Sequence, residues 1–263
     1  VAMDYGELEE MEKTLRLQLP ILAIKMLENV NDIPEEAKRP VKDFGYHLST
    51  CQAFLISVRT ETTIAETKED MWCVEPVIGY GFEEAPQYFL EGRNRYPESA
   101  KTLEAGANWA KNFPRFRHGR YRAIVFAPLK MVNFNPDIFM IYVTPGQLLQ
   151  LLLAKNWLDG YDVKTVMSGH AACVYSVVLT MEKEDIIVSC PCSGMIRYAG
   201  LPENYMIFSA PLRMFKDLLE ALPHLKKALF GMPYNVVLKP EYPLRREYAK
   251  IAKMIGMDWI PVD

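Results

Sequence analysis

Short apolar runs and longer helical stripes alternate along this chain. The run at 138–143 is apolar at every position, and the runs at 21–27 and 124–128 are nearly so, as in strands with both faces buried. Residues 4–18 instead carry leucine and methionine among charges at helical spacing, and Pro20 ends this predicted helix. The alternation predicts an α/β fold, or a mixed α+β fold, and connections of this length favour some parallel strand pairing.

The other predicted elements follow from the same patterns and from signals at their ends. A helix at 147–157 ends near Gly160, because glycine suits the position just after a helix. Ser49 or Thr50, and later Ser168, can cap helices that have a cysteine near their start. The remaining predicted elements are strands at 185–190 and 205–211 and helices at 98–112, 214–221 and 244–255.

Two parts of the chain resemble each other. Residues 125–131 read Val-Phe-Ala-Pro-Leu-Lys-Met, and residues 208–214 read Phe-Ser-Ala-Pro-Leu-Arg-Met. A predicted strand that follows a proline lies upstream of each, at Pro20 and at Pro136. We therefore predict an internal duplication, with two similar halves packed about a pseudo-two-fold axis. The predicted halves are 15–131, with an insertion at 83–118, and 132–220, in a single compact domain (1–263) that ends in an extension at 221–263.

Each predicted half carries a pair of cysteines. The pairs are Cys51 with Cys73 and Cys173 with Cys192. Equivalent residues of a duplicated unit face each other across the axis, so the four thiols could meet at one site. Cys51 and Cys173 fall near predicted helix starts, where the helix dipole should lower the pKa of a thiol. Four thiolates of this kind suit a [4Fe-4S] cluster or a zinc ion.

Other interpretations of the cysteines stay open. The chain has no Cys-x-x-Cys motif and no ferredoxin-like spacing, so buried structural thiols and a redox thiol pair are alternatives. His47 and His170 precede the paired cysteines and are candidate ligands or proton donors, or simply hydrogen-bonding residues. Gly194 and Arg197 can bind an anion through turn amides and the guanidinium, although Arg197 can equally form an ordinary salt bridge.

Composition and charge exclude several classes of protein. The chain has 263 residues and a net charge of −3 without a basic stripe, which argues against a nucleic-acid-binding protein. No apolar run is long enough to span a membrane, and the acidic N-terminal stretch is unlike a signal peptide. We therefore expect a cytoplasmic protein, and five cysteines in that compartment point to metal, redox chemistry or burial.

Several short motifs together resemble a known family. They are Pro-Ile-Leu-Ala-Ile-Lys at 20–25, Cys51-Gln52, Cys73, Ala172-Cys173, and Cys192-Ser-Gly194 followed by Arg197. The combination, over most of residues 15–220, resembles the archaeal and bacterial family of the domain of unknown function 169. Cys190 lies outside the pattern. Members of that family are widespread in anaerobes, so the resemblance favours an oxygen-sensitive cluster. It implies no established activity.

Three functional hypotheses result. The first is an iron–sulfur protein with a redox or electron-transfer role in anaerobic metabolism, with Cys51, Cys73, Cys173 and Cys192 as ligands of a [4Fe-4S] cluster. Its surroundings would be His47, His170, Gln52, Gly194 and Arg197, and its partner a redox protein or small molecule. The second is a non-catalytic module that binds a small anion or cofactor and has structural cysteines. The third is a zinc-stabilised interaction protein. Whether the protein is an enzyme, and whether it forms a homo-oligomer, stays open.

Overall fold

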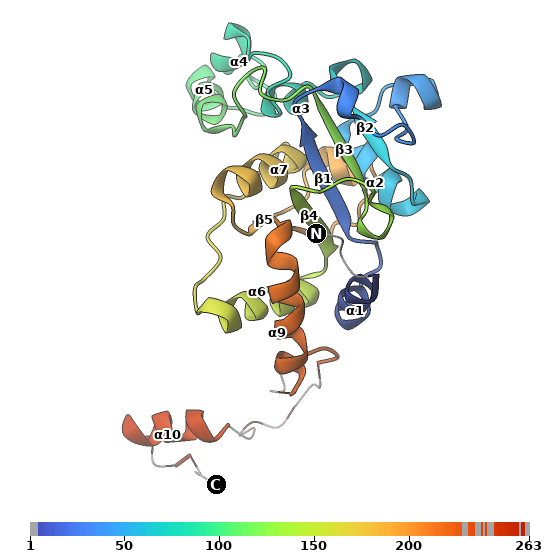
Figure 1. Ribbon diagram of the computed structural model, residues 1–263. Helices are drawn as coiled ribbons and strands as arrows, with labels where there is room; N and C mark the ends of the chain where they lie inside the picture. Colours follow the sequence, from blue (N-terminus) through green and yellow to red (C-terminus); the bar gives the residue numbers. More distant parts are fainter. Residues whose placement is uncertain are drawn as a thin grey trace. The chain divides into compact units, whose positions relative to one another are not determined.

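The computed structural model of the chain describes residues 5–227, 231–234, 238, 240, 245–257 and 259–260 (Figure 1). The chain divides into two compact units, Val1–Met232 and Pro233–Asp263. The sequence predicts one domain with an extension from residue 221. That residue lies inside helix α9 (Phe215–Lys227), which belongs to the larger unit.

The centre of the larger unit is a six-stranded sheet with the order β2-β3-β1-β4-β6-β5. Its strands are rich in isoleucine, valine and phenylalanine, which pack well on a pleated surface. Every pair of neighbouring strands runs antiparallel. The strands are β1 (Leu22–Leu27), β2 (Ile64–Glu66), β3 (Ala123–Pro128), β4 (Ile138–Val143), β5 (Ile187–Ser189) and β6 (Met206–Pro211).

The predicted parallel pairing is wrong for the strands that the structure describes. Parallel contacts occur there only as isolated bridges, between Lys38 and Ile64 and between Leu48 and Met71. The reason is the strand order, because β1 and β2 both run antiparallel to β3, which lies between them. The connection from β1 to β2 does join parallel strands, but these strands are not neighbours. The fold is therefore a mixed arrangement of helices on an antiparallel sheet.

The two halves of the sheet have the same strand order. Reading inward from either edge, the strands are the second, the third and the first of their half, β2-β3-β1 on one side and β5-β6-β4 on the other. The register repeats as well. Leu22, the first residue of β1, lies opposite Pro128, the last of β3, and Ile138, the first of β4, lies opposite Pro211, the last of β6. The sheet thus consists of two three-stranded halves, β2-β3-β1 and β4-β6-β5, which have the same internal register and meet where β1 pairs with β4.

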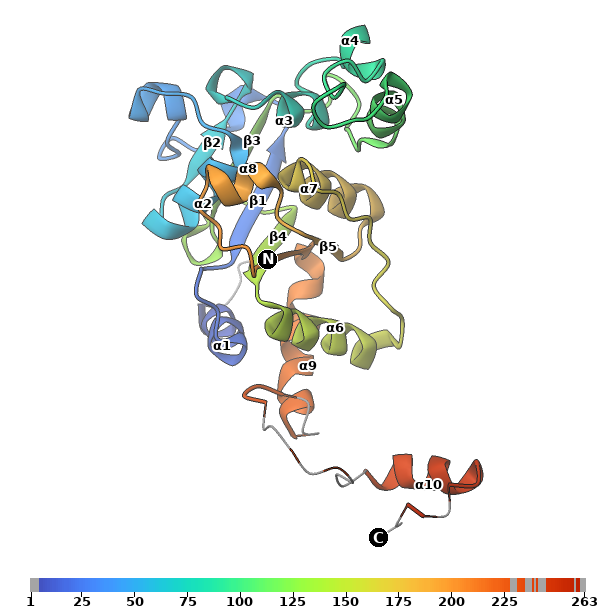
Figure 2. The same cartoon turned by 180° about the vertical axis from the view of Figure 1, so that it is seen from behind.

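Helices cover both faces of this sheet (Figures 1 and 2). Successive strand residues point to opposite faces, so Leu22 and Ile24 join one hydrophobic core and Ala23 joins another. Helices α2 (Thr50–Thr60), α3 (Val74–Gly79), α7 (Ala172–Lys183) and α8 (Ser193–Arg197) contribute to the first core. Helices α1 (Tyr5–Leu15), α6 (Pro145–Asp159) and α9 contribute to the second.

The two crossover helices α2 and α7 end in the same way. Glu61 and Glu184 follow them, and both adopt the left-handed conformation with φ of 51°. The Glu61 carboxylate forms an ion pair with Lys130, and the Glu184 carboxylate forms one with Arg213 at 3.7 Å. Lys130 and Arg213 occupy the same place in the two similar sequence segments, so this contact also repeats.

Helix α7 begins later than the sequence predicts. Ser168 is not its cap, because the Ser168 hydroxyl accepts a hydrogen bond from the His170 amide at 3.2 Å and closes a turn. Ala171 then adopts the left-handed conformation with φ of 49°, and the helix starts at Ala172. The correction leaves Cys173 as the second residue of the helix.

Segment 83–118, the predicted insertion, forms two short helices. Gly92 and Gly106 bring them together, since a Cβ atom on Gly106 would lie only 2.4 Å from the Gly92 carbonyl oxygen. The helices are α4 (Gln87–Leu90) and α5 (Leu103–Asn112). Single helical turns complete the larger unit: η1 (Val30–Asp32), η2 (Pro40–Phe44), η3 (Lys68–Asp70), η4 (Leu129–Met131) and η5 (Leu212–Met214).

The smaller unit contains helix α10 (Arg246–Met254), within the range predicted as a basic helix. Leu244, the first residue of that prediction, lies outside the described residues. Across the described part of the chain, no helix has both the length and the apolar character that a membrane crossing requires.

Candidate functional site

The four paired cysteines line one cavity of about 660 Å³. This volume is in the range of ordinary ligand sites. Cys51 and Cys173 are the second residues of α2 and α7, as the sequence analysis places them in first helical turns. Cys73 and Cys192 immediately precede α3 and α8 as their N-cap residues. Each half of the sheet therefore brings two thiols to the cavity from equivalent helix starts.

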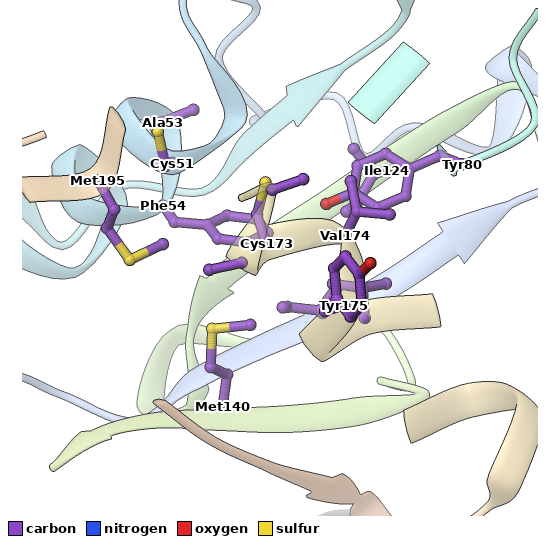
Figure 3. Packing of buried hydrophobic residues seen from close by; sticks show 14 of the residues in the cluster. Cys51, Ala53, Phe54, Tyr80, Ile124, Met140, Cys173, Val174, Tyr175 and Met195 are labelled. Carbon is purple, nitrogen blue, oxygen red and sulfur yellow. The ribbon is translucent and has the colours of Figure 1, made fainter. Parts of the chain in front are cut away.

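All four cysteines are free thiols, and most of their surface is hidden from solvent. Cys51, Cys173 and Cys192 are buried, and Cys73 is half-buried. Cys51, Cys73 and Cys192 all lie near enough to influence the ionisation of Cys173. Figure 3 shows Cys51 and Cys173 among the buried residues of the hydrophobic core that covers one face of the sheet.

The prediction of lowered thiol pKa values is wrong for both residues that it concerns, Cys51 and Cys173. Burial raises the pKa of Cys51 to about 11, and it raises the pKa values of Cys73 and Cys173 well above their usual range. For Cys73 the neighbouring Glu75 carboxylate adds to the effect. Desolvation of a thiolate outweighs the favourable helix dipole here. Without a bound cation these thiols keep their protons at neutral pH and are weak nucleophiles.

One side of the cavity is a polar wall formed by Glu75, Arg95 and His170. Arg95 Nη2 donates to Glu75 Oε1 and Arg95 Nη1 contacts His170 Nδ1, both at 2.9 Å, while the Cys73 thiol donates to Glu75 Oε2 at 3.1 Å. Because a guanidinium only donates, Nδ1 accepts and the proton of the neutral ring sits on Nε2. The Arg95 Cζ atom lies 3.6 Å from the centre of the Trp109 ring, and the Arg95 side chain is 8% exposed. The wall therefore holds a buried cation next to the thiols.

Two fully buried tyrosine hydroxyls lie near the same thiols, and a buried threonine hydroxyl lies next to Glu66. Thr50, Tyr80 and Tyr142 are each 0% exposed, and their oxygen atoms have no hydrogen-bond partner among the described residues. In Figure 3 the hydroxyl of Tyr80 is directed toward Cys173. Tyr142 lies near Cys51 and Cys173. Buried polar groups are nearly always hydrogen-bonded, so these hydroxyls call for a stronger acceptor than a protonated thiol.

A buried carboxyl group lies behind this site. Glu66, the last residue of β2, is completely buried, and both of its oxygens are without a hydrogen-bond partner in the described part of the chain. Burial raises the pKa of Glu66 well above its usual range, so the group holds its proton in the folded protein. Ser189 occupies the same place in β5, because Glu66 pairs with Ile124 and Ser189 pairs with Ile207 in the repeated register.

The other residues proposed from the sequence fall into two groups. His170, Gln52 and Gly194 line the cavity with the cysteines. Oε1 of Gln52 also accepts a hydrogen bond from the Ser49 amide at 3.1 Å, and this contact fixes the start of α2. His47 packs against Trp72 at 5.9 Å between ring centres, and the Arg197 guanidinium lies 5.7 Å from the ring centre of Tyr198. Neither His47 nor Arg197 is among the residues that line the cavity.

Cys190 is also separate from the other thiols. Its Sγ atom donates to the Ser168 carbonyl oxygen at 3.5 Å, and it is not one of the cavity-lining residues. This position agrees with its exclusion from the candidate site.

Sequence reasoning did not find four residues of the site: Glu75, Arg95, Tyr80 and Tyr142. Glu75 follows Cys73 by two residues, which is the one signal that proximity in the sequence offers. Arg95 belongs to segment 83–118, and no motif there marks it as part of a site. The tyrosines sit in apolar surroundings and read as ordinary core residues. Only their positions in three dimensions bring them to the thiols.

Comparison with known proteins identifies the family. The model of the domain of unknown function 169, described as an uncharacterised ArCR family, matches residues 10–221. The chain belongs to this family. The match contains all four cysteines and the polar wall, whereas helix α10 lies beyond it.

One curated protein that is similar to this chain comes from Methanocaldococcus jannaschii. It bears the name "Uncharacterized protein MJ0308" and is 23% identical over 233 residues, which cover 86% of this chain and 97% of the relative. No solved structure matches the chain. The comparisons thus fix the family and leave the function to be inferred from the site.

Proposed function

We propose that this chain binds a [4Fe-4S] cluster through Cys51, Cys73, Cys173 and Cys192 and acts in electron transfer. The observation that carries the proposal is the meeting of four thiols, from segments far apart in the sequence, around one cavity. Buried cysteines serving only as small apolar side chains have no need to gather at four helix starts. Thiolates are the ligands that iron–sulfur clusters use.

The protonation of the thiols favours a metal centre over free-thiol chemistry. A nucleophilic or redox-active cysteine pair works through a thiolate, and burial raises the pKa values of Cys51, Cys73 and Cys173. A bound cation reverses this preference, because a coordinated thiol loses its proton. These three side chains are therefore suited to ligation and poorly suited to catalysis by themselves.

The surroundings also fit a negatively charged cluster. Four thiolates around the iron and sulfide ions give a net negative charge, which the starts of α2 and α7 offset, while Arg95 offsets the charge of the Glu75 carboxylate next to Cys73. The Tyr80 hydroxyl is directed toward Cys173, and Tyr142 lies near Cys51 and Cys173, so ligated sulfur is a candidate acceptor for both hydroxyls.

The spacing that four thiolates take differs between a cluster and a single metal ion. Among the residues that the structure describes, no three His, Cys, Asp or Glu side chains are grouped as ligands of one metal ion. Thiolates on one zinc ion lie only roughly 3.8 Å apart, by tetrahedral geometry at the usual zinc–sulfur distance. The four thiolates of a cubane cluster each bind a different iron and so lie further apart. The sulfur-to-sulfur spacing of the metal-bound protein therefore distinguishes the cluster from the zinc hypothesis.

We also infer that the two halves of the sheet descend from one duplicated unit. The strand order and register repeat, and Ala23 lies opposite Phe139 where the halves meet. Leu22 and Ile24 then pair with Met140 and Ile138, which is the arrangement that a two-fold axis through the central pair would produce. The helix ends at Glu61 and Glu184 repeat as well. Such a duplication explains why each half supplies two ligands.

This function is expected in the cytoplasm, in anaerobic metabolism, with a redox protein or a small molecule as electron partner. The test is anaerobic purification followed by measurement of iron, acid-labile sulfide and zinc, together with the visible absorption spectrum. We expect about four iron and four sulfide per chain and a brown protein, as a [4Fe-4S] cluster requires. A colourless protein without iron contradicts the proposal, and about one zinc per chain selects the zinc-stabilised alternative instead.

Serine substitutions identify the ligands. Cys51→Ser and Cys173→Ser should lose most of the iron, since each removes one of four ligands. Cys190→Ser is the matched control, because Cys190 lies outside the cavity, and it should retain the iron content of the wild type. Equal iron in all three variants would assign the metal to another site.

A further inference from the structure

Two buried tyrosines lie beside the thiols although neither belongs to a cysteine-bearing helix start. Tyr80 is the C-cap residue that directly follows α3, and Tyr142 lies within β4. Each comes from the half of the molecule opposite to the cysteine that affects it most, since Cys173 is the thiol with the largest influence on Tyr80 and Cys51 the one with the largest influence on Tyr142. The tyrosines therefore connect each half of the molecule to the thiols of the other.

Packing alone does not explain the Tyr142 hydroxyl. In the repeated register, the position of Tyr142 in β4 corresponds to Met26 in β1, which fills a buried place in the same core without a polar group. The hydroxyl adds a polar atom to an apolar region, and this atom has no hydrogen-bond partner among the described residues. An unpaired buried hydroxyl is unfavourable, so its presence calls for an acceptor.

The candidate acceptors are the sulfur atoms of Cys173 and Cys51, the thiols that influence the two phenols most. A phenol keeps its proton at neutral pH, so both tyrosines are donors there. A protonated thiol is a weak acceptor, whereas a metal-bound thiolate carries negative charge and accepts a stronger hydrogen bond. Figure 3 shows the Tyr80 hydroxyl directed toward Cys173, which is the geometry that such a bond needs.

We propose that Tyr80 and Tyr142 donate hydrogen bonds to the sulfur atoms of Cys173 and Cys51 in the cluster-bound protein and thereby raise the reduction potential of the cluster. The proposal rests on the cluster proposed above. Reduction adds one electron, and part of its charge falls on the sulfur atoms. A hydrogen-bond donor to sulfur therefore stabilises the reduced form more than the oxidised form.

The experiment compares Tyr80→Phe and Tyr142→Phe with the wild type and with Tyr121→Phe. Tyr121 is the matched control, because it is also buried but packs against Phe116 at 4.9 Å and lines a different cavity. Each protein is purified anaerobically, its iron is measured, and its midpoint potential is determined by a redox titration followed by the paramagnetic resonance signal of the reduced cluster.

We expect Tyr80→Phe and Tyr142→Phe to keep their iron and to have more negative midpoint potentials than the wild type, while Tyr121→Phe matches the wild type. Variants that keep the cluster with an unchanged potential overturn the role of the tyrosines and leave the cluster itself standing. A wild-type protein without iron overturns both proposals. If one variant does not fold, the midpoint potential of the other tests the proposal, because each tyrosine is proposed to donate to a different cysteine.

Discussion

The two halves of the sheet share their backbone plan but differ in their polar side chains. Both contain three strands in the same order and register, a crossover helix, and cysteines at matching helix starts. The first half adds Glu75 beside Cys73, whereas the second has Gly194 at the corresponding distance after Cys192. The first half also supplies Arg95, from segment 83–118. It has the buried Glu66 at the position where the second half has Ser189.

This comparison separates two tasks of the structure. The features that repeat are those that bring four thiols to one cavity. The features that differ decide the charge and the hydrogen bonds around those thiols. One wall of the cavity is therefore polar and contains a buried cation, although the backbone that frames the cavity is nearly the same on both sides.

The largest effect that distinguishes the halves is expected at two glycines near the cysteines. A Cβ atom on Gly79 in α3 would lie 2.3 Å from Cγ1 of Val174, whereas one on Gly194 in α8 would meet Cys192 Sγ only at 3.8 Å. Gly79→Ala should lower the free energy of unfolding by about 1–3 kcal/mol through overpacking. Gly194→Ala should change it by less than about 0.5 kcal/mol.

Urea unfolding of the two glycine variants and the wild type measures both values. Equal stabilities for the two variants would show that the first half tolerates the added methyl group, and would contradict the close approach of α3 to α7.

A smaller effect is expected from the pair Glu66 and Ser189, and it depends on pH. The folded chain holds the Glu66 proton above the pH at which the unfolded chain releases it, because burial raises the pKa of this group. The wild type should therefore lose stability as the pH rises above about 4.5, by at most about 1.4 kcal/mol per pH unit. Glu66→Gln should remove this slope, and Ser189→Ala should leave it unchanged.

The measurement is urea unfolding at about pH 5.5 and about pH 6.5, a window below the titration of the thiols. The same slope in Glu66→Gln and in the wild type would show that Glu66 ionises freely in the folded protein, which would contradict its burial.

The smallest change in stability is expected at Glu61 and Glu184, and it should be the same in both halves. Glu61 and Glu184 adopt the left-handed conformation after α2 and α7, which is unfavourable for a residue with a side chain by about 1–2 kcal/mol. Replacement by glycine relieves this strain, but it adds backbone entropy to the unfolded chain and removes an exposed ion pair. We expect Glu61→Gly and Glu184→Gly each to stabilise the protein by about 0.5 kcal/mol. Thermal unfolding midpoints that move in opposite directions would break the equivalence of the two helix ends.

Much of the fold was accessible from local sequence patterns. The apolar run at 138–143 is a strand with those bounds, and the helix predicted at 147–157 lies within α6, which ends at Gly160. These elements are encoded by side chains that are neighbours in the chain. The start of α7 was missed because a turn at Ser168 and Ala171 competes with a cap, and propensity alone does not decide between them.

The candidate site was partly accessible for the same reason. The similar segments and the paired cysteines indicated which thiols belong together, and the structure brings those four residues to one cavity. The lowered pKa values were predicted from helix position alone and are wrong, because burial is a property of the surrounding chain. Arg95, Tyr80 and Tyr142 had no sequence signal, since nothing near them in the chain marks them as neighbours of sulfur.

The sequence by itself determined the family, the main strands and helices, and the identity of the four thiols, because each depends on residues close together in the chain or on a repeated pattern. Only the tertiary structure decided that neighbouring strands run antiparallel, that burial raises the pKa values of Cys51, Cys73 and Cys173, and that a buried cation and two tyrosine hydroxyls lie near them. Those properties depend on contacts between segments distant in sequence and on the exclusion of water, and neither is contained in a local pattern.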